Sequence, residues 1–312
     1  DSPGIGIRRA IVCPERSCQY RKRSSEMRHI MIRYGDGSGA GNGHRIRMQR
    51  LARALTQRGA PPDIRPFNFV ETLDVLKRKG ADVLVTDIPK NDDGELEAFR
   101  PYAGLLVVGV GIGHSITADT SWIADVIISQ NLRPNSWFSW NPAPGCKMLG
   151  GEDYLMVDPQ SQSWRRTDPG TECLTYFGAG TPPEYIDDCL QELHMRLPAT
   201  AGIVDTSRIP LSGPFGRRLA AARLLVCTMG MAVNDALAVG TGAVVISRDN
   251  EHERDAIAAA LPGSVLSLGQ LESISPNELA RNAAERYNAA RVRPRSRIDG
   301  LGVYRVARAL LE

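Results

Sequence analysis

The sequence predicts an α/β protein with two doubly wound, Rossmann-like domains that face each other across a cleft. The chain has 312 residues, more than a single hydrophobic core usually organises. Short apolar runs typical of buried strands alternate with helical patterns, first from residue 30 and again from residue 172. A segment rich in proline and tryptophan, residues 131–151, separates the two series and is expected to form a long ordered loop.

The composition is that of a globular protein. Hydrophobic residues make up 42% of the chain and charged residues 23%, which excludes a disordered protein. No run approaches the roughly 20 apolar residues that cross a bilayer, and no signal peptide opens the chain. We therefore expect a cytoplasmic protein with no membrane span. The net charge is +3, and arginine supplies almost all of the positive charge, which need not indicate phosphate recognition.

The first series of elements begins with a strand signal at residues 30–32. After a glycine-rich loop, apolar residues at helical spacing predict a helix that starts at Arg45 and ends at Gly59. Further strands are expected at residues 64–69, 83–87, 105–110 and 126–129, and helices at residues 70–79 and 95–99. Residues 1–28 are expected to form a flexible basic extension, with a translated upstream segment or a nucleic-acid arm as alternatives.

The second series repeats the alternation. Its strands are expected at residues 172–177, 201–204, 224–228, 243–247 and 265–268. Its helices are expected at residues 182–196, 216–222, 232–239, 251–261 and 276–290. With a linker near residues 159–170, the expected domains are residues 29–165 and 166–312. Ligands of such sheets bind outside the carboxyl ends of the strands, so the loops at those ends are the candidate sites.

A glycine-rich loop, residues 37–43, joins the first strand to the first helix and ends at His44. Glycines permit a tight strand-to-helix turn, and the N–H groups of the first helical turn favour a negative group in front of them. The positive end of the helix also lowers the pKa of an imidazole and keeps it neutral, as a general base requires. The alternative is that His44 only caps the helix or fills the loop.

Three loops of the second series have similar character. Gly178, Gly180 and Thr181 follow a strand and open a helix, which suits a phosphate or a sugar ring. Thr228 and Gly230 precede a helix with Asn234 and Asp235 in its first turn. Those two side chains are expected to contact a diphosphate and ribose hydroxyls, or else merely to cap the helix. In the third loop, residues 248–253, His252 is expected to be a solvated surface residue.

The cysteines do not indicate a metal site. Cys173, Cys189 and Cys227 lie in predicted strands or helices, where a free cysteine behaves as a small hydrophobe. Cys13 and Cys18 lie close together, but no second pair follows at zinc-site spacing. We expect no disulfide framework, no structural metal and no tightly bound cofactor.

Several motifs together resemble a known family. Residues 41–47 are similar to the Gly-x-Gly-His-x-x-Arg loop of the UDP-sugar hydrolase of pseudaminic acid biosynthesis, itself similar to GT-B glycosyltransferases of the murein lipid II type. In the same order, residues 124–131 resemble its Cys-Asp-Leu-Leu-x-x-Gln-Asn segment, and residues 151–154 its Gly-x-x-Tyr. Asn250 and Glu251 stand where the family tends to have Asn-Gln. A last helix over residues 300–311 fits the usual ending of the family, so the resemblance runs from about residue 31 to the C-terminus.

The resemblance implies a GT-B-like nucleotide-sugar enzyme. Its C-terminal domain holds the UDP moiety, its N-terminal domain presents the acceptor, and its last helix packs back toward the N-terminal domain. His44 would be the catalytic residue. The residues implied to contact the nucleotide sugar are Gly41, Gly43, Gly178, Gly180, Thr181, Thr228, Gly230, Asn234, Asp235, Asn250 and Glu251.

The first domain departs from the family pattern at three positions. Residues 87–89 read Asp-Ile-Pro in place of Asp-His-Tyr, residues 117–119 replace an Asp-Asp pair, and Asp158 replaces an arginine. The C-terminal, donor-binding domain therefore matches the family pattern better than the N-terminal, acceptor-side domain. We expect a metal-independent glycosyltransferase that uses a UDP-type donor. The alternatives are a UDP-sugar hydrolase with water as acceptor and a non-catalytic nucleotide-sugar-binding protein.

Hydroxymethylated DNA is a further candidate acceptor. Arg45, Arg50 and Arg53 follow the active-site loop, while residues 133–147 interleave positive and aromatic side chains. Arginines can hold phosphates, and rings can stack an extruded base. The alternative is that the aromatic side chains pack a domain interface and the arginines are solvated.

Overall fold

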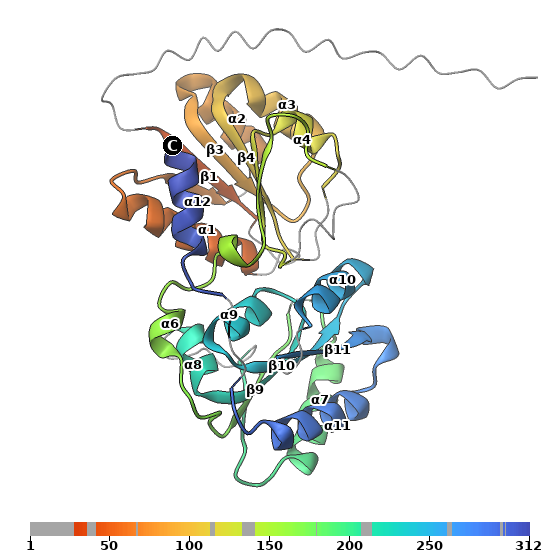
Figure 1. The fold of residues 1–312 in the computed structure, drawn as a ribbon. Helices are drawn as coiled ribbons and strands as arrows, with labels where there is room; N and C mark the ends of the chain where they lie inside the picture. Colours follow the sequence, from red (N-terminus) through yellow and green to blue (C-terminus); the bar gives the residue numbers. More distant parts are fainter. Residues whose placement is uncertain are drawn as a thin grey trace, which may run out of the picture.

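A computed structural model describes residues 28–312 except 36–41, 67, 113–115, 133–140, 179, 207–213, 261–263, 294–295 and 297. Within these residues the chain forms two parallel sheets, each covered by helices on both faces (Figure 1). The predicted fold class, two doubly wound α/β domains, is confirmed.

The first sheet has six parallel strands in the order β2-β1-β3-β4-β5-β6. Successive strand residues point to opposite faces, so Ile32 of β1 packs under α1 and Met31 under α2 and α3. The elements are β1 (Ile30–Tyr34), α1 (Gly43–Gln57), β2 (Asp63–Pro66), α2 (Phe69–Lys79), β3 (Ala81–Asp87), α3 (Asp93–Phe99), β4 (Ala103–Val110), α4 (Thr120–Ile123), β5 (Val126–Ser129) and β6 (Lys147–Leu149).

The second sheet has five parallel strands in the order β11-β10-β9-β7-β8. Helices α8, α9 and α10 pack on one face, and α7 and α11 on the other. The elements are β7 (Glu172–Tyr176), α7 (Pro183–Arg196), β8 (Gly202–Asp205), α8 (Phe215–Ala221), β9 (Ala222–Thr228), α9 (Met231–Val239), β10 (Gly242–Ser247), α10 (Asn250–Ala259), β11 (Val265–Gln270) and α11 (Pro276–Ala289).

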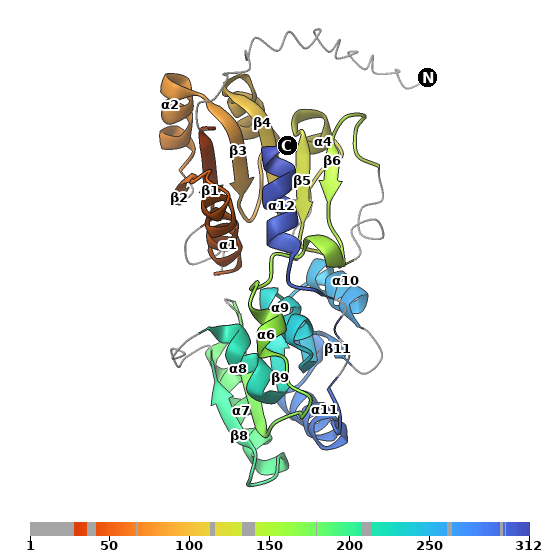
Figure 2. The same ribbon diagram turned by 60° about the vertical axis from the view of Figure 1, so that its left-hand side comes forward.

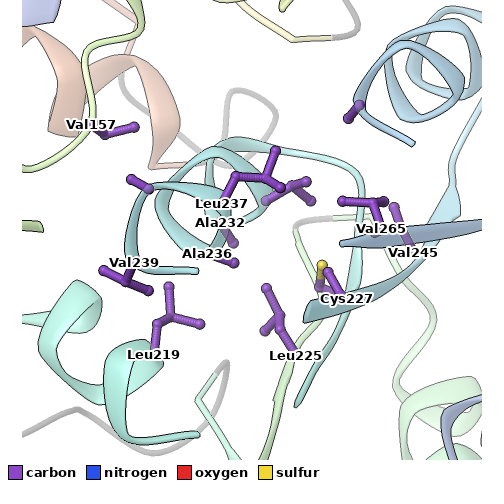
Figure 3. Packing of buried hydrophobic residues seen from close by; sticks show 14 of the residues in the cluster. Val157, Leu219, Leu225, Cys227, Ala232, Ala236, Leu237, Val239, Val245 and Val265 are labelled. Carbon is purple, nitrogen blue, oxygen red and sulfur yellow. The ribbon is translucent and has the colours of Figure 1, made fainter. Parts of the chain in front are cut away.

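Helix α9 lies inside the protein. Its residues from Ala232 to Val239 are all buried, and Figure 3 shows Ala236 and Leu237 among apolar side chains of α8, β9, β10 and β11. A helix surrounded on all sides has no solvated face for polar side chains. Asn234 and Asp235, which lie on this helix, therefore need partners within the protein or in a ligand.

The last helix, α12 (Gly302–Leu311), returns to the first sheet. Val303, Val306 and Leu310 are spaced to share one face, and they pack with Leu51 and Leu55 of α1. Figure 2 shows α12 beside the elements of the first sheet, although it follows the second sheet in the chain. Burying these side chains ties the end of the chain to the helix that carries His44.

The predicted element ends lie within about two residues of the observed ones for most elements. Three short helices and strands of the described residues were not predicted: α4 (Thr120–Ile123), β6, which lies inside the expected loop of residues 131–151, and α6 (Ser161–Trp164), which lies in the expected linker. A three-residue edge strand and a single helical turn are too short to show a periodic pattern. The expected extension over residues 1–28 lies outside the described residues except for Arg28.

Candidate functional site

The first candidate centre lies where the strand order of the first sheet reverses. From β1 the chain passes through α1 to β2 on one side of β1, whereas β3 pairs with its other side. Loops that leave such neighbouring strands in opposite directions open a crevice at the carboxyl edge. His44 is the second residue of α1, and Asp87 is the last residue of β3. Gly41 lies outside the described residues.

His44, Asp87 and Arg47 form one buried cluster. Nδ1 of His44 lies 2.8 Å from Oδ1 of Asp87. Arg47, one turn farther along α1, donates from Nε to Oδ2 of Asp87 and from a terminal nitrogen to Oδ1. The three residues are 2%, 0% and 2% exposed, respectively. An arginine fork and an imidazole thus converge on a single carboxylate away from solvent.

The arrangement selects one tautomer of His44. The same Arg47 nitrogen that contacts Asp87 also lies 2.7 Å from Nδ1 of His44. If Nδ1 accepted from Arg47, its lone pair would face the Oδ1 lone pairs at 2.8 Å, which is repulsive. An Nδ1–H group that donates to the carboxylate avoids this repulsion, at the cost of an Arg47 N–H group that then lies beside Nδ1 without bonding it. We therefore assign the proton to Nδ1, which leaves the basic lone pair on Nε2.

The cluster holds His44 neutral and Asp87 ionised. Burial lowers the pKa of His44, the charge of Arg47 lowers it further, and Asp87 offsets only part of this effect. Burial by itself raises the pKa of Asp87, but the Arg47 charge and then His44 hold that pKa well below its usual range. A neutral imidazole oriented by a carboxylate is what a general base near neutral pH requires.

Two helix amino ends meet beside this cluster. The cap residues of α1 and α9, Asn42 and Gly230, make no side-chain cap hydrogen bond, and neither first turn holds an acidic residue. A Cβ atom on Gly43 would lie 3.3 Å from Cγ of Met231, so the two first turns are in contact across the domains. Because neither the cap residues nor the first turns supply a negative side chain, the place where these positive helix ends meet favours an anion.

The second candidate centre lies where the second sheet reverses, between β7 and β9. The N–H group of Gly178 donates to Oγ1 of Thr228 at 2.8 Å, which joins the loops after the two strands. Gly180 has a φ of +93°, a conformation that a residue with a side chain rarely adopts. Thr181 is buried, and its hydroxyl has no hydrogen-bond partner among the described residues. The structure thus brings these four predicted residues together.

A third loop contributes Arg248, for which the sequence pattern predicts no role. A terminal nitrogen of Arg248 lies 2.8 Å from Nε2 of His252, and Nδ1 of His252 lies 2.8 Å from Oδ1 of Asp249. The other terminal nitrogen would lie 3.6 Å from a Cβ atom on Gly180, so the guanidinium faces the loop after β7. The expectation that His252 is solvated is wrong: it is buried because its ring lies between Arg248 and Asp249.

The remaining predicted donor residues make contacts within the protein. Oδ1 of Asn250 accepts from Gln270 of β11 at 2.7 Å, and the N–H group of Glu251 donates to the capping carboxylate of Asp249. Asn234 and Asp235 reach the other domain, where Asn234 donates to the Gln130 carbonyl at 3.1 Å and Asp235 accepts from Arg50. Asn250, Asn234 and Asp235 therefore use side-chain atoms, and Glu251 its backbone N–H group, for contacts within the protein.

The structure describes only part of the basic and aromatic cluster that was proposed for a DNA acceptor. Arg50 is held by Asp235, and Arg45 donates to Oδ1 of Asn42. Arg133 and the aromatic residues at 137, 138 and 140 lie outside the described residues.

Within the part of the chain that the structure describes, none of the helices has both the length and the apolar character that crossing a bilayer requires.

Two members of the His44 cluster were given no role from the sequence. Arg47 follows His44 by three residues, so helical spacing alone places the two on one face of α1. Asp87 ends a predicted strand, which is the expected edge for a site, but its partner is 43 positions away. The strand order that brings these residues together cannot be read from the sequence pattern.

No family model matches the sequence, and no curated protein does. Solved structures match it over most of its length. A Methanocaldococcus jannaschii UDP-GlcNAc 2-epimerase in complex with UDP-GlcNAc and UDP is 12% identical, with a TM-score of 0.56 over 91% of this chain and 99% of that one. MurG from Acinetobacter baumannii is 14% identical, with a TM-score of 0.57 over 91% and 99%. The spinosyn forosaminyltransferase SpnP is 10% identical, with a TM-score of 0.56 over 92% and 95%. The chain therefore has the GT-B fold that these enzymes share.

Proposed function

We propose that the protein is a glycosyltransferase that moves a sugar from a UDP-type nucleotide sugar to an acceptor hydroxyl. The observation that carries the proposal is the 2.8 Å contact between Nδ1 of His44 and Oδ1 of Asp87, at the switch point of the first sheet. His44 lies in the first turn of α1, which contacts the first turn of α9. Helix α9 in turn follows Thr228 at the end of β9 in the second sheet. The names of the structural neighbours, an epimerase bound to UDP-GlcNAc and a forosaminyltransferase, support a nucleotide-sugar donor.

His44 acts as the general base in this proposal. Nε2 takes the proton of the acceptor hydroxyl while the acceptor oxygen forms a bond to the anomeric carbon. The bond from that carbon to the diphosphate oxygen breaks, and the nucleoside diphosphate leaves with the electron pair. Asp87 remains ionised and stabilises the imidazolium that forms. Arg47 balances the buried carboxylate, so that His44 is neutral before the reaction.

The second domain holds the donor in this proposal. The uncapped amino ends of α1 and α9 provide oriented dipoles for the charge that grows on the leaving diphosphate. The Thr181 hydroxyl and the backbone of Gly180 provide hydrogen bonds to the donor, while the Gly178 N–H group stays bonded to Thr228 and joins the two loops. The Arg248 guanidinium, held by His252, supplies a positive charge beside the same loop.

The test is acceptor-dependent release of UDP. The full-length protein is incubated with UDP-glucose and UDP-GlcNAc, first in buffer and then with small sugars, a lipid acceptor or hydroxymethylcytosine-containing DNA. A glycosylated product together with UDP supports the transferase. Rapid UDP release in buffer alone, abolished by His44→Asn, makes water the acceptor and the protein a hydrolase. Nucleotide binding without turnover for any donor would contradict both reactions and leave a binding protein.

A further inference from the structure

Arg50 of α1 and Asp235 of α9 form a forked ion pair between the two domains. Both terminal nitrogens of Arg50 donate to the two carboxylate oxygens of Asp235, each at 3.0 Å. One of these two nitrogens, Nη1 of Arg50, also donates to the backbone carbonyl of Met156 at 2.9 Å. The side chains are only 10% and 6% exposed. This planar, bidentate geometry fixes the direction as well as the distance between the two helices.

Two more polar contacts cross between the domains beside this pair. Asn234, the neighbour of Asp235, donates to the Gln130 carbonyl at 3.1 Å. With its amide nitrogen turned toward α10, Asn131 donates to both carboxylate oxygens of Asp255, at 3.0 and 2.9 Å. Gln130, Asn131, Asn234 and Asp255 are all buried. The segment after β5 therefore bonds α9 and α10, while α1 bonds α9 through Arg50.

The pair acts on the helix that carries the proposed base. Arg50 follows His44 by six residues on α1, a separation of ~9 Å along a rigid helix. Asp235 lies in the second turn of α9, the helix whose first turn contacts Gly43. The amino ends of α1 and α9 therefore cannot separate while the fork is intact. An exposed ion pair would give little rigidity, but a buried fork with further hydrogen bonds leaves a costly unpaired charge when one partner is removed.

We propose that Arg50 and Asp235 are positioning residues that hold α1 against α9 and so set the distance between His44 and the donor loops. Their catalytic effect rests on the function proposed above, whereas their effect on the two helices does not. The proposal gives Asp235 a role different from the ribose contact expected from the sequence. Because Arg50 bonds both oxygens of Asp235 in the structure, we expect the removal of this carboxylate to move the helices.

The structural arm of the test measures amide hydrogen exchange in the full-length protein. Peptides covering residues 43–50 and 231–239 report on the two helices. We expect Arg50→Gln and Asp235→Asn each to speed their exchange by about tenfold, and the double variant to exchange no faster than the worse single one, because the pair acts as a unit. Arg50→Lys, which keeps the charge but not the fork, should fall between wild type and Arg50→Gln. Arg58→Gln, which removes an exposed arginine at the end of the same helix, should match wild type.

The second arm separates positioning from donor binding. We expect Arg50→Gln and Asp235→Asn to lower kcat by about tenfold while the Kd for UDP stays within about twofold of wild type. The proposal is overturned if both single variants show the amide exchange rates of wild type, or if their effects on the exchange rates simply add in the double variant. It is equally overturned if Asp235→Asn weakens UDP binding about tenfold while Arg50→Gln does not. Absence of turnover in wild type would count against the glycosyltransferase, but the exchange result would still decide the role of the pair.

Discussion

Nδ1 of His44 lies 2.8 Å from Oδ1 of Asp87, although the two residues are 43 positions apart in the chain. One begins the helix after β1 and the other ends β3, so the contact exists only because these strands are neighbours in the sheet. Both side chains are buried, and Arg47 completes the charge balance. The contact fixes the orientation of the His44 imidazole, which the proposed role as general base requires.

The pH dependence of turnover should report on His44. Because burial and Arg47 lower its pKa, the neutral base persists below the pH at which a free histidine would protonate. We expect kcat/KM to fall with an apparent pKa below about 6.5, the ordinary value for histidine. In His44→Asn this limb should disappear, and kcat should drop by a factor of about 10² to 10⁴. A limb that survives the substitution would assign the base to another residue.

The stability of the protein in acid should depend on Asp87. The pKa of this carboxyl lies below its usual range, because Arg47 and His44 outweigh the effect of burial. Its contribution is therefore fully present above pH ~4 and is lost as the pH falls below that. Asp87→Asn leaves Arg47 buried without its charge partner and should cost about 3 to 5 kcal/mol at neutral pH.

Urea unfolding of Asp87→Asn and wild type, followed from pH 7 to pH 3, measures both effects. The difference between their free energies of unfolding should shrink as the pH falls. Wild type then loses the stabilisation by the ionised Asp87 carboxylate, which the variant lacks at every pH. A constant difference over this range would mean that the charge of Asp87 is not what stabilises the cluster.

Most of the fold was predictable because local patterns repeat. Helix α1 shows apolar residues at helical spacing and a Gly59 with a φ of +77° at its end, and the buried strands are continuous apolar runs. The three-residue β6 was not predictable, since so short an edge strand leaves no pattern. The packing of α12 against α1 is a long-range contact that no local pattern predicts. Only the resemblance to the family implied it.

The site was predicted in part. Helix-start and loop residues such as His44, Gly180 and Thr181 carry local signals of glycine content and position after a strand. Asp235 also carried such a signal, but its partner is Arg50 of the other domain, 185 positions away. A polar residue near the start of a helix does not reveal whether a ligand or another domain will satisfy it. Only the placement of the two domains distinguishes these roles.

Thr181 should show opposite effects on stability and on binding. Its buried hydroxyl has no partner among the described residues, so Thr181→Val should leave the melting temperature of the free protein unchanged or raise it. If the hydroxyl bonds the donor, the same change should weaken UDP binding by about tenfold or more. Thr228→Val is the contrast, because its hydroxyl accepts from Gly178 and its loss should destabilise the free protein.

Thermal unfolding with and without UDP measures both quantities for Thr181→Val. A lower melting temperature without ligand, combined with an unchanged shift on adding UDP, would contradict the assignment of Thr181 to the donor site.

The contact between α12 and α1 should contribute strongly to stability. Leu310 is 1% exposed and packs in the core that α12 shares with α1, so Leu310→Ala should cost about 2 to 5 kcal/mol through the cavity it leaves. Leu301→Ala is the matched control, because Leu301 is 46% exposed and should change stability little. Urea denaturation compares the two variants. Equal effects would show that the packing of α12 is not what stabilises this domain.

The proposed roles of the two candidate centres are tested most directly by pairing turnover with nucleotide affinity in a single variant. His44→Asn removes the base and leaves the donor loops at Gly178 and Thr228 as they are. We predict that UDP release from a donor sugar falls by a factor of about 10² or more while the Kd for UDP stays within about twofold of wild type. Unchanged release, or a loss of affinity that accounts for the whole effect, would contradict His44 as the base.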